Sequence, residues 1–231
     1  MIDDLRVSSL KPDLQADQHK ILMRGLNLMR STGVRPKLVL HVCCAPCSSY
    51  PLQLLAKYFE VKVVFNNPNI YPRQEFVRRY KELIDYVTKL YRTKKELAQH
   101  IQIIGAMEDV YDRQNTDINK CLSPFGDEPE GLNRCKECFK YRLSFAFEVA
   151  RTYGCEYVMT TLTVGSKKNS ATINEIALEL NRELYPDLVY LPSDFKKDGG
   201  DVKTKDICDE YGIYRQKYCG CIYSFRETLK S

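Results

Sequence analysis

The stretch Leu38-Val-Leu-His-Val-Cys-Cys-Ala-Pro-Cys47 decides how the rest of the chain is interpreted. Its first five residues are short, apolar and partly β-branched, which is typical of a buried strand. A stretch just beyond them, 45–49, is typical of a turn. A helical pattern over 49–59 and a second apolar run, Val61–Phe65, come next. Strand, helix and strand at this spacing predict two parallel strands joined by a helix.

The same alternation continues toward the C-terminus. Helical patterns follow Pro72, begin again at Cys135, and recur around 173–180, while residues 112–133 predict the longest loop, broken by short helices. We therefore expect one α/β domain, 36–231, with an open, mostly parallel sheet and helices on both faces, preceded by a helical extension over 1–35. Further strands are expected at Ile101–Ile104, Tyr157–Thr161 and Leu188–Leu191.

Composition limits the classes of function. No apolar run is long enough to cross a membrane, and Met1–Leu10 carries two aspartates where a signal peptide has an apolar segment. We expect a cytoplasmic, reducing environment, in which clustered cysteines bind metal or do redox work. The 35 lysines and arginines exceed the 30 aspartates and glutamates by five, which permits a nucleic-acid partner without requiring one.

Seven of the ten cysteines fall into three groups. The first group comes straight after the first predicted strand, and ligands of open parallel sheets bind at the carboxyl ends of the strands. The second group opens a predicted helix, with two thiols three residues apart on one face, where the helix N-terminus favours the thiolate. In the third group, a glycine lets the backbone turn tightly between two sulfurs. The groups are Cys43, Cys44 and Cys47; Cys135 and Cys138; and Cys219 and Cys221.

Seven thiolates are more than one metal group uses. A zinc ion and a 4Fe-4S cluster each take four protein ligands. The excess favours a cluster together with a second iron or a redox-active thiol pair. A structural zinc site with three spare thiols is the alternative. Cys121, Cys155 and Cys208 stand alone in the sequence and are expected to be small buried apolar side chains.

Five sequence blocks, in order from His41 to Ser224, resemble the cobalamin-independent epoxyqueuosine reductase family, QueH. Two of the blocks depart from the family pattern: Gly165-Ser166 stands where Ser-Pro is usual, and Leu132 stands in place of a glycine. None of these residues is a proposed ligand. The blocks are His41-Val-Cys-Cys-Ala-Pro-Cys-Ser-Ser49, Glu130-Gly-Leu-Asn-Arg-Cys-Lys-Glu-Cys-Phe139, Thr160-Thr-Leu-Thr-Val-Gly-Ser-Lys-Lys-Asn169, Asp194-Phe-Lys-Lys197 and Tyr214-Arg-Gln-Lys-Tyr-Cys-Gly-Cys-Ile-Tyr-Ser224.

The resemblance implies a fold and a reaction. The fold is that of the Rossmann-like nucleotide-binding domains of the HUP and PP-loop group. The reaction is the last step of queuosine synthesis, in which epoxyqueuosine at the wobble position of transfer RNA loses its epoxide oxygen as water. It also implies a 4Fe-4S cluster with a second iron or a redox thiol function beside it, and an electron donor that the sequence does not identify.

The resemblance also assigns roles to residues. Cys43, Cys44, Cys135 and Cys138 are the expected cluster ligands. Cys219 and Cys221 would form a redox-active disulfide or hold the second iron, and Cys47, which matches an aspartate position in some members, would bind that iron too. An epoxide also needs a proton donor, and Asp194, Tyr218 and Glu130 lie beside the motifs.

Transfer RNA carries many phosphates, so cations are expected at the approach to the site. Lys167, Lys168, Lys196, Lys197 and Arg215 are the expected phosphate contacts, and Tyr218 is expected to stack on an extruded base. Two other functions remain open: a PP-loop-like thiolase or sulfurtransferase acting on transfer RNA, and a non-catalytic zinc module that binds RNA. The Ser-Gly-Gly-x-Asp-Ser loop of the first is absent, and 43–49 takes its place.

Overall fold

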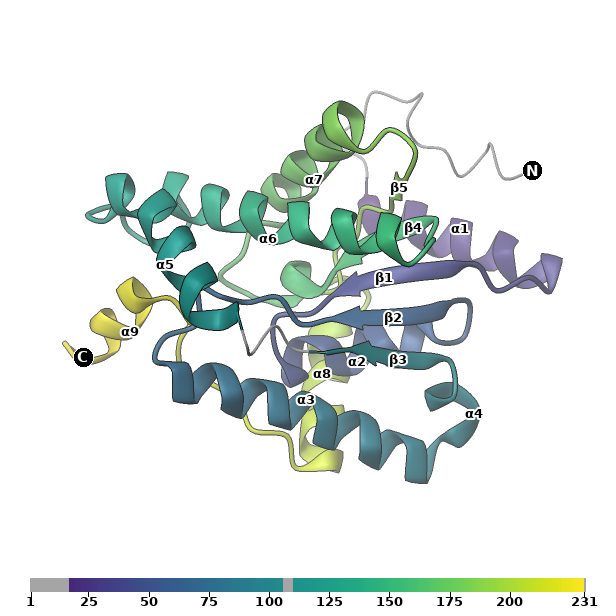
Figure 1. The fold of residues 1–231 in the computed structure, drawn as a ribbon. Coiled ribbons are helices and arrows are strands. Elements are labelled where there is room, and N and C mark those ends of the chain that lie inside the picture. The colour runs from purple at the N-terminus through teal and green to yellow at the C-terminus, as the bar shows by residue number, and fades with distance from the viewer. Residues whose placement is uncertain (1–16, 106–109, 231) are drawn as a thin grey trace.

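The computed structural model describes residues 17–105 and 110–230, and its centre is one five-stranded sheet (Figure 1). Every strand pair in this part of the chain is parallel, in the order β3-β2-β1-β4-β5. The expected open parallel sheet is therefore confirmed. The strands are β1 (Lys37–His41), β2 (Glu60–Val64), β3 (Ile101–Ile104), β4 (Tyr157–Thr160) and β5 (Val189–Tyr190).

Helices cover both faces of this sheet (Figure 1). Helices α2, α3 and α8 pack on one face, and α6 and α7 pack on the other. The helices are α1 (Gln18–Thr32), α2 (Ala45–Leu55), α3 (Arg73–Thr93), α4 (Lys95–Ala98), α5 (Tyr111–Leu122), α6 (Asn133–Thr152), α7 (Ser170–Leu184), α8 (Gly200–Tyr211) and α9 (Ile222–Thr228), with 3-10 turns η4 (Ser123–Phe125) and η5 (Thr161–Val164).

Alternating side chains divide the core into two layers. In β1, Leu38 and Leu40 point to the α2 and α3 side, while Val39 points to the α6 and α7 side. All three are fully buried, which is why the strand is apolar on both faces. Helix α1 adds Leu22 and Leu26 to the first layer, so the described part of the N-terminal extension packs on the main domain. Residues 1–16 of that extension lie outside the described residues.

The strand order places a switch point between β1 and β4. From β1 the sheet grows through β2 and β3 on one side, and through β4 and β5 on the other. The chain segments that leave the carboxyl ends of β1 and β4 therefore diverge, and a crevice opens between them. Cys43 and Cys44 follow β1, and η5 follows β4, so the first cysteine group stands at this crevice.

Three elements differ from the sequence-based expectations. The predicted turn at 45–49 is the first turn of α2, because Pro46 suits a helix start and the Cys44 sulfur caps it. Half of the predicted loop at 112–133 belongs to α5, whose sparse apolar face packs on α6. Helix α9, just after Cys221, was not predicted. No helix in the described ranges is long and apolar enough to span a membrane.

Candidate metal centre

The first cysteine group forms a tight cluster of sulfurs at the start of α2. The Sγ atoms of Cys43, Cys44 and Cys47 all lie within 4.8 Å of one another, and those of Cys43 and Cys44 are 3.8 Å apart. The extended backbone at Cys44 places its sulfur at the helix N-cap, where it accepts a hydrogen bond from the Cys47 N–H at 3.5 Å. No other group of three metal-binding side chains this close occurs among the residues that the structure describes.

Hydrogen bonds within this cluster favour one thiolate. The thiols of Cys44 and Cys47 donate to the Cys43 sulfur, which holds the pKa of Cys43 well below its usual range. The same contacts, together with burial, raise the pKa of Cys44 to about 12 and that of Cys47 well above its usual range. Of the three thiols, that of Cys43 is therefore the most readily deprotonated.

The third group is held by helix α3 and by the loop between β2 and α3. Arg79 of α3 donates to the carbonyl oxygens of Cys219 at 2.8 Å and Tyr218 at 3.2 Å. Between the two cysteines, Gly220 adopts a φ of 138°, and its carbonyl accepts from the Tyr71 N–H at 2.7 Å. The expected tight turn at Gly220 is confirmed, because this φ is one that glycine alone adopts readily.

The second group occupies the first two turns of α6. The Cys135 sulfur accepts a hydrogen bond from the Gly131 N–H at 3.2 Å. One turn on, Cys138 is 8% exposed, and its sulfur lies 4.0 Å from Nη1 of Arg142. Both sulfurs thus sit beside N–H donors, which is an arrangement that stabilises a thiolate or a metal-bound sulfur.

One cavity of about 460 Å³ lies between the first and third groups. Cys43, Cys47 and Cys219 line it, whereas Cys135 and Cys138 lie outside the lining but within electrostatic range of Cys219 and Cys221. The residues that line this cavity include Cys43, Cys47, Cys219, Arg79, Glu130, Lys167, Lys168, Gln216, Lys217 and Tyr218.

Burial keeps most of these thiols protonated in the metal-free chain. It raises the pKa of Cys138 to about 12, and it raises the pKa values of Cys135 and Cys219 above their usual range. Metal binding to such sulfurs must release protons. Donors are already in place for the resulting charge: Gln216 Nε2 reaches the Cys44 sulfur at 3.0 Å, and the Ser224 N–H reaches that of Cys221 at 3.4 Å.

The cations expected at the site fall into two classes. Lys167 and Lys168 line the cavity, as does Tyr218. Burial lowers the pKa of Lys168, but negative charge on nearby cysteine sulfurs, Cys43 foremost, outweighs it and raises that pKa above its usual range. Lys197 and Arg215 are exposed and lie outside the lining.

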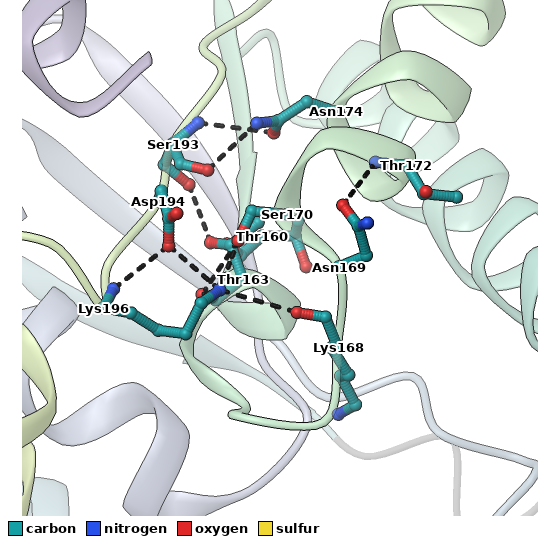
Figure 2. Close-up of polar contacts among 10 residues, drawn as sticks. All are labelled: Thr160, Thr163, Lys168, Asn169, Ser170, Thr172, Asn174, Ser193, Asp194 and Lys196. Carbon is teal, nitrogen blue, oxygen red and sulfur yellow. Dashed lines mark hydrogen bonds and ion pairs between the residues drawn. The ribbon is translucent and has the colours of Figure 1, made fainter. Parts of the chain in front are cut away.

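Asp194 and Lys196 form a separate polar cluster behind the loop that carries Lys168 (Figure 2). Their ion pair measures 2.9 Å, and the Lys196 ammonium also donates to the Thr163 carbonyl at 2.9 Å and to the Ser170 hydroxyl. The side chain of Lys168 points away from this cluster (Figure 2). Neither charge of the pair lines the cavity, so both are used to fix the loop between η5 and α7.

Sequence reasoning missed three residues of the site. Arg79, Arg142 and Gln216 all contact cysteine sulfurs or the backbone beside them. No spacing rule links Arg79 to Cys219. Gln216 lies within the block Tyr214–Ser224, and this position was the only indication in the sequence that it belongs to the site. Arg142 lies four residues after Cys138, on the same helical face, and that spacing was a usable indication.

Comparisons with known proteins agree with one another. Residues 38–227 match the family described as "Epoxyqueuosine reductase QueH". A protein of that name from Streptococcus pyogenes serotype M1 is 34% identical over 218 residues, which cover 94% of this chain and 82% of the relative. The Staphylococcus epidermidis protein of that name is 33% identical over 97% of this chain and 91% of its own length. The Thermotoga maritima protein of that name is 29% identical over 82% of this chain and 91% of its own length.

Proposed function

The chain belongs to the epoxyqueuosine reductase QueH family, and from this membership we propose that it reduces epoxyqueuosine to queuosine in transfer RNA. One structural observation carries the proposal: cysteines far apart in sequence meet at one cavity at the carboxyl edge of the sheet, which Cys43 and Cys47 of the first group and Cys219 of the third group line. The matched region, 38–227, contains all seven of these cysteines. A cytoplasmic location, where thiols remain reduced, suits this centre.

The reaction removes one oxygen atom. The epoxide takes up two electrons and two protons, its two C–O bonds break, a carbon–carbon double bond forms, and the oxygen leaves as water. The site must therefore polarise the oxygen, supply an electron pair and supply protons. Sulfur-rich centres that contain iron meet the first two needs.

The residues present fit an iron–sulfur group. Hydrogen-bond donors face the sulfurs of Cys44, Cys135 and Cys221, as they do around thiolate-bound clusters. Two cations, Arg142 and Lys168, stand near the sulfurs, where they would offset the negative charge of a thiolate-bound group. We propose that Cys43, Cys44, Cys135 and Cys138 hold a 4Fe-4S cluster. When bound, such a cluster would supply electrons one at a time.

Cys219 and Cys221 are proposed to complete the electron count. As a dithiol, they would give two electrons and two protons to the epoxide and become a disulfide, which an external donor then reduces. As ligands, they would hold a second iron together with Cys47. Arg79 supports either role by fixing the backbone at Cys219, which lines the cavity. Single-turnover assays separate the two roles, because only the dithiol role predicts that the wild-type protein ends its turnover with a disulfide between Cys219 and Cys221. Replacement of either cysteine by serine would prevent this disulfide.

Access for transfer RNA is proposed from the side of the cationic residues. Lys167 and Lys217 are exposed and line the cavity, so they can meet phosphates beside an extruded nucleotide. Tyr218 lines the same wall, where an aromatic ring can contact a base. Its hydroxyl donates to the Tyr71 carbonyl at 2.5 Å, which orients the ring. Lys197 and Arg215 lie farther out and are proposed to contact more distant phosphates.

Asp194 and Lys196 are proposed to act through the loop between η5 and α7. Their charges pair with each other, and the Lys196 ammonium bridges the Thr163 carbonyl and the Ser170 hydroxyl, which flank the loop on either side. This bridge sets where Lys167 and Lys168 stand. Glu130, which lines the cavity, is the better placed carboxyl group to deliver a proton to the leaving oxygen.

The test is anaerobic incubation of iron-loaded protein with transfer RNA that carries epoxyqueuosine, a chemical reductant, and nucleoside mass analysis. We expect a product that has lost one oxygen atom. Cys43→Ser should abolish the conversion, whereas Cys121→Ser, at an exposed cysteine outside the cavity, should preserve it. Fully metal-loaded protein that leaves the epoxide unchanged would rule out this function.

A further inference from the structure

Arg142 is a buried cation on α6, one turn after Cys138. The residue is 2% exposed. Its Nη2 donates to Oδ1 of Asn67, its Nη1 lies 4.0 Å from the Cys138 sulfur, and its Nε has no hydrogen-bond partner. Asn67 is itself held by a 2.8 Å hydrogen bond from Nδ2 to the Val42 carbonyl, beside the first cysteine group. The guanidinium thus bridges the second cysteine group and the loop after β2.

This charge has no carboxylate partner within 17–105 and 110–230. Two other arginines on helices near the site are paired: Arg79 with Glu75 at 2.7 Å, and Arg151 of the same helix with Asp187. A buried charge without a counter-charge is costly, because no water solvates it. A helix that retains such a charge next to the buried sulfur of Cys138 is suited to face an anion.

Within the described part of the chain, the contacts of the guanidinium do not include a carboxylate. Nη2 meets the neutral amide oxygen of Asn67, and Nη1 meets the sulfur of Cys138, a proposed cluster ligand. The anion that this cation would face is therefore the thiolate-bound group that the cysteines would hold.

We propose that Arg142 is the built-in counter-charge of the iron–sulfur group, and that it sets the reduction potential of this group. The inference rests on the proposed function, because it needs a thiolate-bound cluster between the cysteine groups. Such a cluster is anionic, and each electron it accepts adds a negative charge. A nearby buried cation therefore stabilises the reduced form more than the oxidised form and raises the potential.

The experiment compares Arg142→Gln with Arg142→Lys in anaerobically reconstituted protein. Glutamine keeps a donor for Asn67 but removes the charge, and lysine keeps the charge. Midpoint potentials are measured by dithionite titration followed by electron paramagnetic resonance. Arg151→Gln is the matched control, because Arg151 lies on the same helix and its charge is already paired at the surface.

We expect Arg142→Gln to lower the one-electron reduction equilibrium constant tenfold or more, a shift of about 59 mV to more negative potential. Arg142→Lys should shift much less, and Arg151→Gln should match the wild type. An unchanged potential in Arg142→Gln would overturn the proposal. Equal shifts in the glutamine and lysine variants would overturn it as well, because a structural contact rather than charge would then be responsible.

Reconstitution itself provides a second measurement. If Arg142→Gln cannot hold the cluster while Arg142→Lys holds it under the same conditions, the counter-charge is supported. If both variants lose the cluster, the proposal fails. The proposed function is separable from these results. If Arg142→Gln shows the expected potential shift but the wild type does not act on the epoxide, the reaction alone is refuted. An active wild type without a cluster would refute the counter-charge alone.

Discussion

Nη1 of Arg79 donates to the carbonyl oxygen of Cys219 over 2.8 Å, across 140 positions of sequence. The arginine side chain is 2% exposed, and its Nε is paired with Glu75 one turn before it on α3. Because Nη2 also reaches the Tyr218 carbonyl, the guanidinium holds two consecutive peptide groups. A helix packed on the sheet thereby fixes the backbone of a cysteine that lines the cavity.

Arg79→Met should lower the free energy of unfolding of the metal-free protein by about 3 kcal/mol, because it leaves a nearly buried Glu75 without its partner. Urea unfolding measures this. The control is Arg73→Met, which removes an ion pair with Asp112 from the first turn of the same helix. Those side chains are 48% and 73% exposed, so the change should be within about 0.5 kcal/mol. Equal losses in both variants would contradict the buried role of Arg79.

Gly220→Ala should destabilise the protein and impair metal retention. A Cβ at this position would lie 3.1 Å from Nη1 of Arg79 and 3.1 Å from Cγ1 of Ile70, at a φ of 138°. The expected loss is about 1–3 kcal/mol in unfolding free energy. Gly212→Ala is the matched control, because its φ is also positive but its Cβ would meet nothing within 4 Å. Full iron retention in Gly220→Ala would show that the tight turn is dispensable.

Local patterns were sufficient to predict the layers of the fold. Each strand is apolar enough to be recognised alone, and β3 begins and ends at the predicted residues, Ile101–Ile104. The start of α2 was placed four residues late, because the first turn holds Pro46, and two serines follow it. Helix α5 was hidden because only Tyr111, Ile118 and Leu122 are buried, and its stability comes from packing on α6.

The candidate site was predictable only where its residues cluster in sequence. The spacing of the cysteines in the sequence was enough to identify the three groups. Their position relative to one another depends on the strand order β2-β1-β4, which no local pattern encodes. Lys196 looked like a phosphate contact from its position in a lysine pair. Its ammonium instead bonds to Thr163 and Ser170 across a turn of the chain (Figure 2). Tertiary hydrogen bonds of this kind determine whether a charged side chain is available to a ligand, and they cannot be predicted from a local sequence pattern.

Lys167→Met should weaken transfer RNA binding. Lys167 is exposed at the edge of the cavity, so its loss removes one phosphate contact and should reduce the slope of log affinity against log salt by about 1. Filter binding at several salt concentrations measures this slope. Lys205→Met, at an exposed lysine of α8 outside the cavity, should leave it unchanged. A slope that is the same in wild type and Lys167→Met would place the phosphates elsewhere.

Alkaline pH should weaken the loop that supports Gly220. Burial, with a contribution from Asp112, raises the pKa of Tyr111 to about 12 from 10.0, and its hydroxyl donates to the Ile70 carbonyl. The unfolded chain therefore loses this proton first, so the stabilisation is complete below pH 10 and disappears as pH rises to about 12. Urea unfolding across this range should show a shallower alkaline decline in Tyr111→Phe. Identical pH profiles for the two proteins would contradict this assignment.

The meeting of the three cysteine groups around iron is tested most directly by anomalous diffraction at the iron edge, on crystals of the reconstituted protein grown without oxygen. The account predicts iron density in the cavity between Cys43, Cys138 and Cys219, bonded to sulfurs from more than one group. Crystals of active protein in which iron is absent from this cavity, or is bound at one cysteine group alone, would contradict it.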